Sequence, residues 1–352
     1  MGRRGLRRGP GTVAGSAPAG RSGPTVAGRA QRDAEPGGAA LRRPVAVSRK
    51  WRDVSSGPLP PGLARRQRVT WPSVSTAVPA ATSRSWSHAF GDLAAGWDQR
   101  ELWGHLGWQD IRQRYRRSVL GPLWISITMA VTAVGLGILY AGLFGNDLAT
   151  QLPYVLVGFI VWGFISGCIS EGSEVFTSNV GLITHLPAPL SVHLYRLLWR
   201  QTLFFLHNLA VYVIMIFIFP PHFTWPDLAV FPAFALLLAN GAWVALLLGI
   251  VTTRFRDLAP ITQSVVQLAF YMTPIVWFYD DLRNSANHAI RERAALVELN
   301  PFFHFLEIVR RPMLGEPQLV NSWIVVLVIT VVGWALTLVA LRRYRSRISY
   351  WV

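Results

Sequence analysis

Cysteine is nearly absent from this sequence, which has one, Cys168, among its 352 residues. A single thiol cannot form an intrachain disulfide or a cysteine metal cluster. The eight histidines show no ligand spacing such as H-x-x-x-H. The sequence therefore predicts no disulfide, no metal site and no cofactor held by this chain.

Charged side chains are also scarce. They make up 15% of the residues, against about 25% in soluble domains, whereas 51% of the residues are hydrophobic. The hydrophobic residues gather in runs of about 20, the length of a helix that crosses a hydrocarbon core roughly 30 Å thick. The sequence therefore predicts an all-α, polytopic membrane protein.

Lysine occurs once, at Lys50, although the net charge is +16. A basic chain can bind nucleic acid, but a basic tail and basic loops on a membrane protein explain the charge without it. Lys50 lies in "VSRKWRD", so no Walker A loop is present, and neither G-x-S-x-G nor H-E-x-x-H occurs. If this chain works against a gradient, the energy must come from a separate subunit.

The first third of the chain falls into two segments. Residues 1–95 are rich in Arg, Gly, Pro, Ala and Ser without apolar periodicity, which predicts a disordered cytoplasmic tail. A start codon assigned upstream of the true one is the alternative explanation. Residues 96–118 mix Trp and Leu with Arg, which predicts an amphipathic helix in the membrane interface. Two apolar faces are expected, one containing Trp103 and the other containing Trp108 and Ile111.

A transmembrane domain is predicted over residues 119–352, with six spans. They are expected at 119–144, 153–176, 197–219, 228–251, 261–278 and 322–341. Arginines precede the first span and follow the fourth and sixth, whereas loops 145–152 and 220–227 contain no Lys or Arg. By the positive-inside rule, both termini are cytoplasmic in the plasma membrane, as is the loop 179–190.

The outer segment 279–321 is partly apolar and predicts one or two short re-entrant or gate helices, broken at Asn300-Pro301. It also contains the adjacent carboxylates Asp280 and Asp281. These could act on a lipid-linked sugar, as in an integral-membrane glycosyltransferase, or simply cap the following helix. The second interpretation is favoured, because no further acidic or histidine residue accompanies the pair.

The cytoplasmic loop 179–190 reads "NVGLITHLPAPL" and is unusually apolar for a surface loop. An exposed Leu-Ile-Leu pattern indicates a contact with another protein. Charged residues flank this loop where spans two and three end and begin. We hypothesise an ion-pair frame formed by Glu171, Glu174, Arg196 and Arg200. Independent snorkelling of each side chain to the interface is the alternative.

Four stretches resemble one family. They are "WQDIRQRYRRSVLGPLW" (108–124), "NVGLITHLPAPLSVHLYRL" (179–197), "RFRDLAPITQSVVQLAFYMTPIVW" (254–277) and "NPFFHFLEIVRRPMLG" (300–315). In their order and spacing they resemble the permease subunits of ABC-2 type polysaccharide exporters, such as those for O-antigen and teichoic acid. The resemblance covers about residues 98–352.

This resemblance implies an ABC-2 permease fold, a homodimer, and a separate ATPase subunit that carries ATP and Mg²⁺. The implied cargo is a polyprenyl-pyrophosphate-linked polysaccharide, which passes outward along the dimer axis. The Arg-for-Lys bias indicates a GC-rich genome and favours a cell-wall galactan over other glycans. An ABC-2 permease for a drug or small lipid is the alternative, and the glycosyltransferase remains a weaker one.

The resemblance also implies roles for particular residues. Coupling to the ATPase is implied for Asn179, Leu182, Ile183, His185, Leu186, Pro187, Pro189, Arg254, Arg256 and Asp257. His185 and Leu186 replace the basic and aromatic residues common in the family loop, so this contact is expected to be specific to its own ATPase. The lipid pyrophosphate is expected to meet Arg112, Arg114, Arg116 and Arg117. General attraction to anionic membrane lipids is the alternative for these arginines.

The outer aromatic residues are expected to line the glycan path or outer gate, because flat rings attract a sliding sugar chain without fixing its register. They are Tyr271, Trp277, Phe278, Tyr279, Phe302, Phe303 and Phe305. An ordinary aromatic belt at the membrane interface is the alternative.

Overall fold

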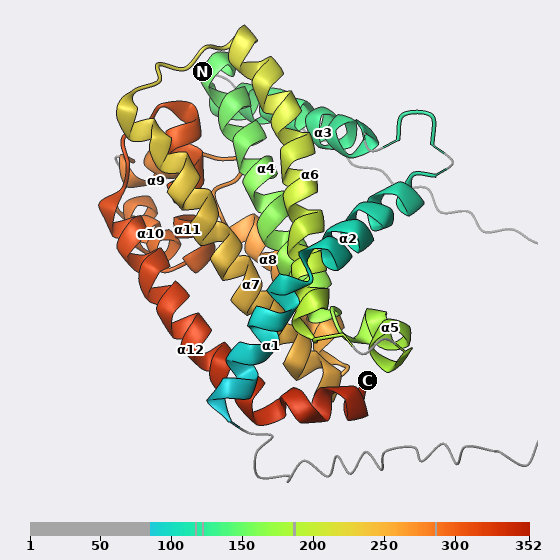
Figure 1. Ribbon diagram of the computed structural model, residues 1–352. Helices are drawn as coiled ribbons and strands as arrows, with labels where there is room; N and C mark the ends of the chain where they lie inside the picture. The colour runs from blue at the N-terminus through green and yellow to red at the C-terminus, as the bar shows by residue number, and fades with distance from the viewer. Residues whose placement is uncertain (1–84, 117, 122, 186–187, 286) are drawn as a thin grey trace, which may run out of the picture. The chain divides into compact units, whose positions relative to one another are not determined.

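The computed structural model describes residues 85–352, except 117, 122, 186, 187 and 286, and this part of the chain is all-helical (Figure 1). Its elements are α1 (Trp86–Asp98), α2 (Arg100–Arg114), α3 (Leu123–Phe144), α4 (Leu148–Ser173), η3 (Thr177–Asn179), α5 (Val180–His185), α6 (Ser191–Ile218), η4 (Trp225–Ala229), α7 (Val230–Arg254), α8 (Leu258–Met272), α9 (Tyr279–Arg283), α10 (His288–Glu298), α11 (Pro301–Leu314) and α12 (Val320–Trp351). The predicted all-α class is confirmed.

The N-terminal boundary predicted at residue 95 is wrong. Helix α1 begins at Trp86, where Ser85 Oγ caps it by accepting a hydrogen bond from the His88 backbone N–H at 3.3 Å. Ala89 and Asp92 of this helix are buried. Ten residues assigned to the tail therefore belong to the folded domain, while residues 1–84 lie outside the described part.

In the described part of the chain, five helices are long and apolar enough to cross a membrane: α3, α4, α6, α7 together with η4, and α12. Helix α4 is the most buried of them and packs against α3, α6 and α7 (Figure 1). The close approach of α4 and α7 requires glycine, because a Cβ at Gly172 would lie 2.6 Å from the Ala245 Cα. Small residues at such contacts are typical of membrane helix packing.

The prediction of one helical span over 261–278 is wrong. Helix α8 has 15 residues, or about 22 Å, which is shorter than the roughly 30 Å of a hydrocarbon core. It ends at Met272, next to Thr273 and Pro274, and no regular helix follows until Tyr279. Proline lacks a backbone N–H and cannot continue the helical hydrogen bonding.

Side chains from α4 and α11 satisfy the irregular backbone that follows α8. Gln151 Nε2 donates to the Val276 carbonyl at 2.8 Å. Tyr154 Oη and Arg310 Nη1 both donate to the Pro274 carbonyl, at 3.3 and 2.7 Å. Non-helical backbone at membrane depth is tolerated only where protein or water satisfies its polar groups. Buried polar residues of two other helices therefore make this break possible.

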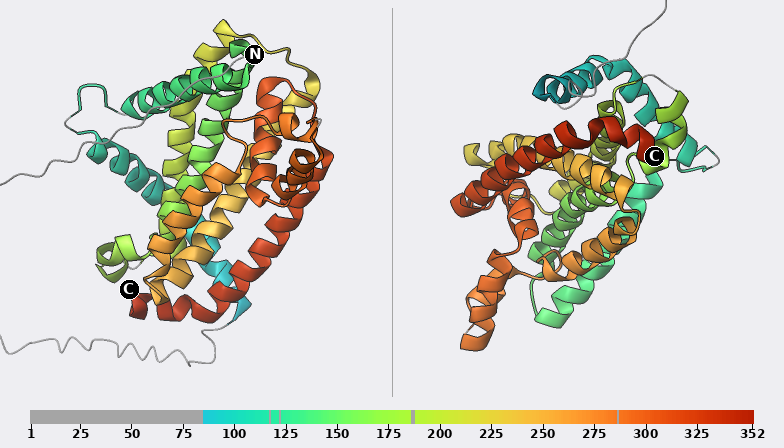
Figure 2. Two further views of the ribbon diagram at one scale, coloured as in Figure 1. Left: turned by 180° about the vertical axis from the view of Figure 1, so that it is seen from behind. Right: turned by 90° about the horizontal axis from the view of Figure 1, so that it is seen from below.

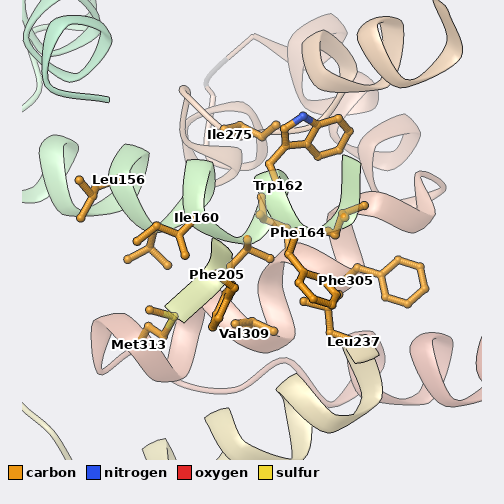
Figure 3. Close-up of a cluster of buried hydrophobic side chains, with 14 of the residues drawn as sticks. Leu156, Ile160, Trp162, Phe164, Phe205, Leu237, Ile275, Phe305, Val309 and Met313 are labelled. Atoms are coloured by element: carbon orange, nitrogen blue, oxygen red, sulfur yellow. The ribbon is translucent and has the colours of Figure 1, made fainter. Parts of the chain in front are cut away.

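The main hydrophobic cluster surrounds α4 and includes side chains from α6, α7 and α11 (Figure 3). Leu156, Ile160 and Phe164 of α4 meet Val309 and Met313 of α11 in this cluster. Helix α11 is the third of three short helices between α8 and α12. It begins at the predicted break, where Asn300 Oδ1 accepts from the Phe302 N–H at 3.0 Å.

A second buried cluster joins one end of the helices, and we call it the basic-end cluster. It contains Ala89, Val175, Phe176, Leu190, Leu194, Leu197, Ala245, Leu246, Ile250, Leu341 and Ile348. These residues come from α1, the end of α4, the start of α6, and the last parts of α7 and α12. We call this end of the domain the basic end, because Arg196 of α6, Arg254 of α7 and Arg345 of α12 lie close in sequence to these cluster residues.

Candidate functional site

The loop 179–190 contains a short helix, α5, at the basic end, beside the start of α6 (Figures 1 and 2). Leu182 is half-buried and His185 is exposed. Ile183 packs against the basic-end cluster, so it rests on the chain's own core as well as reaching the surface. Leu186 and Pro187 lie outside the described residues, and Pro189 is half-buried just before α6.

The start of this loop is held to its neighbours by Asn179. Its Nδ2 donates to the Val175 carbonyl at 2.8 Å, and its Oδ1 accepts from Arg196 Nη1 at 3.0 Å. One amide side chain therefore connects the loop to both α4 and α6.

An ion-pair chain connects α6 to α2 and to α4. Arg196 Nη2 lies 2.5 Å from Asp110 Oδ1, and Arg200 Nη1 lies 2.6 Å from Asp110 Oδ2. Arg200 Nη2 also lies 2.6 Å from Glu171 Oε2, which accepts a further hydrogen bond from Gln201 at 2.7 Å. The single carboxylate of Asp110 therefore bridges two arginines one helical turn apart.

The predicted ion-pair frame is brought together only in part. Glu171 contacts Arg200, but Arg196 pairs with Asp110, which sequence reasoning missed. Glu174 is exposed and makes no ion pair with any residue that the structure describes. The signal for Asp110 was its position as the one acidic residue in the arginine-rich stretch "WQDIRQRYRR".

The charge state of Asp110 follows from its partners. Burial raises the pKa of this carboxyl, but the hydrogen bond and charge of Arg196, together with the charge of Arg200, outweigh it and lower the pKa below its ordinary 3.8. Asp110 is therefore ionised at neutral pH, and the ion-pair chain is intact.

A cavity of about 460 Å³ opens beside this ion-pair chain, between α2, α4, η3 and α6. Its charged lining consists of Asp110, Arg114, Glu171, Glu174, Arg196 and Arg200, which is three acidic and three basic side chains. Because the charges balance and two arginines already hold carboxylates, the cavity does not have the excess positive charge that a phosphate site requires.

A smaller cavity of about 220 Å³ separates the loop 179–190 from the junction of α7 and α8. Glu174, Thr177 and Val180 line one side, and Arg256 lines the other. Arg254 instead turns toward α12, where its guanidinium carbon lies 5.5 Å from the Trp351 ring centroid. Asp257 is exposed just before α8. The structure thus brings Arg256, but not Arg254, close to the loop.

Helix α2 packs on α6 through Trp103, Gly107 and Ile111. A Cβ at Gly107 would lie 2.9 Å from Trp199 Cδ1, and Ile111 is buried. The predicted pair of apolar faces is therefore wrong, because residues from both predicted faces share the buried one, while Trp108 is exposed. The packing with α6 selects positions four apart, a single stripe along the helix.

The arginines expected to meet a lipid pyrophosphate lie at the end of α2. Arg112, Arg114 and Arg116 are exposed, whereas Arg117 lies outside the described residues. Arg114 lines the larger cavity, and its guanidinium carbon lies 5.8 Å from the Phe204 ring centroid. These three side chains are available to anionic groups.

The outer aromatic residues do not form one surface. Tyr279, Phe303 and Phe305 are buried, and the Tyr279 and Phe303 rings pack with centroids 4.8 Å apart. Core packing occupies their faces in this conformation, and their place on a glycan path stays a prediction. Tyr271 is exposed. Trp277, Phe278 and Phe302 are half-buried against the main cluster.

The two adjacent carboxylates Asp280 and Asp281 are exposed in the first turn of α9. Carboxylates are stabilised at this position, because the N-terminal end of a helix carries a partial positive charge. Among the described residues no three His, Cys, Asp or Glu side chains are grouped so that they could hold a metal ion.

The chain belongs to the ABC-2 type transporter family, whose model matches residues 101–314. The O-antigen export system permease protein RfbA of Myxococcus xanthus is 21% identical over 209 residues, which cover 57% of this chain and 78% of the relative. The permease of the same name from Klebsiella pneumoniae is 24% identical over 179 residues, 49% of this chain and 67% of the relative.

The chain is therefore the membrane subunit of an ABC transporter, a transport component rather than an enzyme. ABC-2 permeases work with an ATPase subunit. The matched range runs from α2 through α11, so it includes the ion-pair chain, α5 and the α7–α8 junction.

Proposed function

We propose that this chain is the permease subunit of an exporter for a polyprenyl-pyrophosphate-linked polysaccharide, an O-antigen-like glycan or a cell-wall galactan. The observation that carries the proposal is the likeness to two O-antigen export permeases, over 209 and 179 residues of this chain. Two copies of the chain form the path, and a separate ATPase subunit supplies the energy.

The basic end faces the cytoplasm, because arginines lie at the ends of α7 and α12 there and the opposite short loops have none. Helix α7 ends at the basic end, and α12 begins at the other end and returns. The chain must cross between them, so α8 and residues 273–278 together make a sixth, broken crossing. Both ends of the membrane domain are then cytoplasmic, in the plasma membrane.

Helix α5 is the part of the chain that the ATPase moves. Leu182 supplies an apolar contact, and Arg256 supplies a charged one across the smaller cavity. The segment is short and is fixed by Asn179 at one end and by the start of α6 at the other. A stiff connection of this kind passes motion to the long helices instead of absorbing it.

The exposed arginines Arg112, Arg114 and Arg116 meet the pyrophosphate of the lipid carrier at the inner leaflet, since arginine pairs bidentately with phosphate. Among the aromatic residues assigned to the glycan path, Tyr271 is exposed, and Trp277, Phe278 and Phe302 are half-buried. Rearrangement in the dimer brings these rings to the glycan.

Depletion of the chain in its native host tests the cargo. Lipid-linked glycans are extracted from inside the cell and separated by length. The proposal predicts that long polymer accumulates inside and decreases at the surface. Normal surface polymer, together with sensitivity to drugs or loss of a small lipid from the outer leaflet, would instead assign the alternative cargo.

A further inference from the structure

Asp92 is a charged residue that the membrane domain buries almost completely, with 3% of its surface exposed. It lies on α1, outside the range matched by the family. Its carboxylate accepts three hydrogen bonds: from the Leu190 N–H at 3.3 Å, from the Ser191 N–H at 3.0 Å and from Arg345 Nε at 2.8 Å. The donors come from the start of α6 and from the far end of α12.

The first two of these bonds form a helix cap supplied by another helix. The first N–H groups of an α-helix have no partner within it, and a carboxylate there is also favoured by the helix dipole. The N-cap residue of α6 is Leu190, whose side chain has no oxygen. Asp92 therefore provides what the sequence of α6 lacks at its own N-terminus.

Two further hydrogen bonds hold α1 against α6 at this point. Ser191 Oγ donates to the Asp92 carbonyl at 2.5 Å, and Tyr195 Oη donates to the Leu93 carbonyl at 3.1 Å. Gly96 allows the close contact, because a Cβ at that position would collide with the Ser191 hydroxyl. Helices α1 and α6 therefore pack closely at this point.

The third bond extends the connection to α12. Arg345 pairs with Asp92 across 253 positions of sequence, next to Leu341 and Ile348 in the basic-end cluster. Leu190 and Ser191 are also the residues at which the loop 179–190 becomes α6. A single carboxylate thus joins the end of this loop to the last turns of α12.

We infer that Asp92 is a positioning residue for energy coupling: it links displacement of the loop 179–190 to α12. This rests on the proposed function, in which an ATPase displaces α5. Asn179 carries the motion to α4 and α6, and Asp92 carries it to α12 through Arg345. Helix α1 therefore connects the start of α6 to the end of α12.

Hydrogen exchange in the purified complex with its ATPase tests this, with and without a non-hydrolysable ATP analogue. In the wild type, the analogue changes exchange both around residues 188–195 and in the last turns of α12. In Arg345→Gln, which leaves the α6 cap in place, the change at 188–195 persists and the change in α12 is lost. Arg343→Gln, an exposed arginine on the same turn of helix, is the matched control and behaves as wild type.

Asp92→Asn neutralises the group that accepts hydrogen bonds from Leu190, Ser191 and Arg345. Hydrogen exchange at the Leu190 and Ser191 amides is expected to become faster. Asp98→Asn is its control, because Asp98 is exposed on the same helix. The inference is overturned if α12 does not respond to the analogue in the wild type, or if it still responds in Arg345→Gln. Since no cargo enters this experiment, failure of the proposed export function is detected separately, by the glycan analysis.

Discussion

At the scale of single residues, the arginines of α6 depend on acidic residues from elsewhere in the chain. Arg196 and Asp110 are 86 positions apart, and their pairing depends on how α2 crosses α6. The sequence could predict that Arg196 and Arg200 need partners near a membrane, because unpaired charges there are costly. It could not predict which carboxylate reaches them, since Asp110, Glu171 and Glu174 are all expected at a similar depth in the membrane.

The substitution Asp110→Asn tests the ion-pair chain. It leaves Arg196 with neutral partners only, while Arg200 keeps Glu171. Charge-assisted hydrogen bonds contribute about 1.5–3 kcal/mol each, so we expect a loss of roughly 2 kcal/mol. The measurement is thermal unfolding of the purified chain in detergent. Glu174→Gln is the control, since Glu174 is exposed. Equal melting temperatures for the two variants would contradict the assigned role of Asp110.

The pH dependence of this contribution has a defined sign. The pKa of Asp110 is lower in the folded protein than its ordinary 3.8, so its stabilisation is fully present above that value. It is lost as the pH falls through the folded pKa. The difference in stability between Asp110→Asn and wild type is therefore expected to be constant from pH 7 down to about pH 5 and to shrink below it.

At the scale of elements, length and hydrophobicity predicted the helices that are apolar throughout, and failed where buried polar residues intervene. Helix α8 looked like part of an 18-residue span, but Thr273 and Pro274 end it early. Gln151, Tyr154 and Arg310 donate to the buried carbonyls that have no helical partner, and none of the three lies near α8 in sequence. Helix α1 was missed for a related reason, because its stability comes from contacts with α6 and α12.

The packing of α4 against α7 gives a prediction at this scale. Gly172→Ala places a methyl group 2.6 Å from the Ala245 Cα, so the two backbones must separate. Overpacking of this kind costs about 1–3 kcal/mol. Gly163→Ala is the matched control on the same helix, since a Cβ at Gly163 meets open space. Thermal unfolding should show a loss for Gly172→Ala alone, and similar losses in both would contradict the close approach.

At the scale of the whole molecule, the basic end brings together α5 and Arg256, which resemblance had assigned to coupling, and the ion-pair chain, which it had not. Helix α5, Arg256 and the ion-pair chain lie around two neighbouring cavities. The family pattern could locate the loop 179–190, because it is apolar, proline-rich and flanked by charge. It could not indicate α1 and Arg345, which lie outside the matched range and complete the support of this loop.

We propose that the ATPase subunit moves α5 when it hydrolyses ATP, and that this movement drives the export of a lipid-linked glycan. Cells depleted of the chain are complemented with wild type, with Leu182→Asp or with Leu182→Met, and intracellular lipid-linked glycans are measured together with the amount of chain in the membrane. We predict that Leu182→Asp inserts normally yet leaves long polymer inside the cell, because a buried charge breaks the apolar contact. Leu182→Met should restore export. Full restoration by Leu182→Asp would contradict the account.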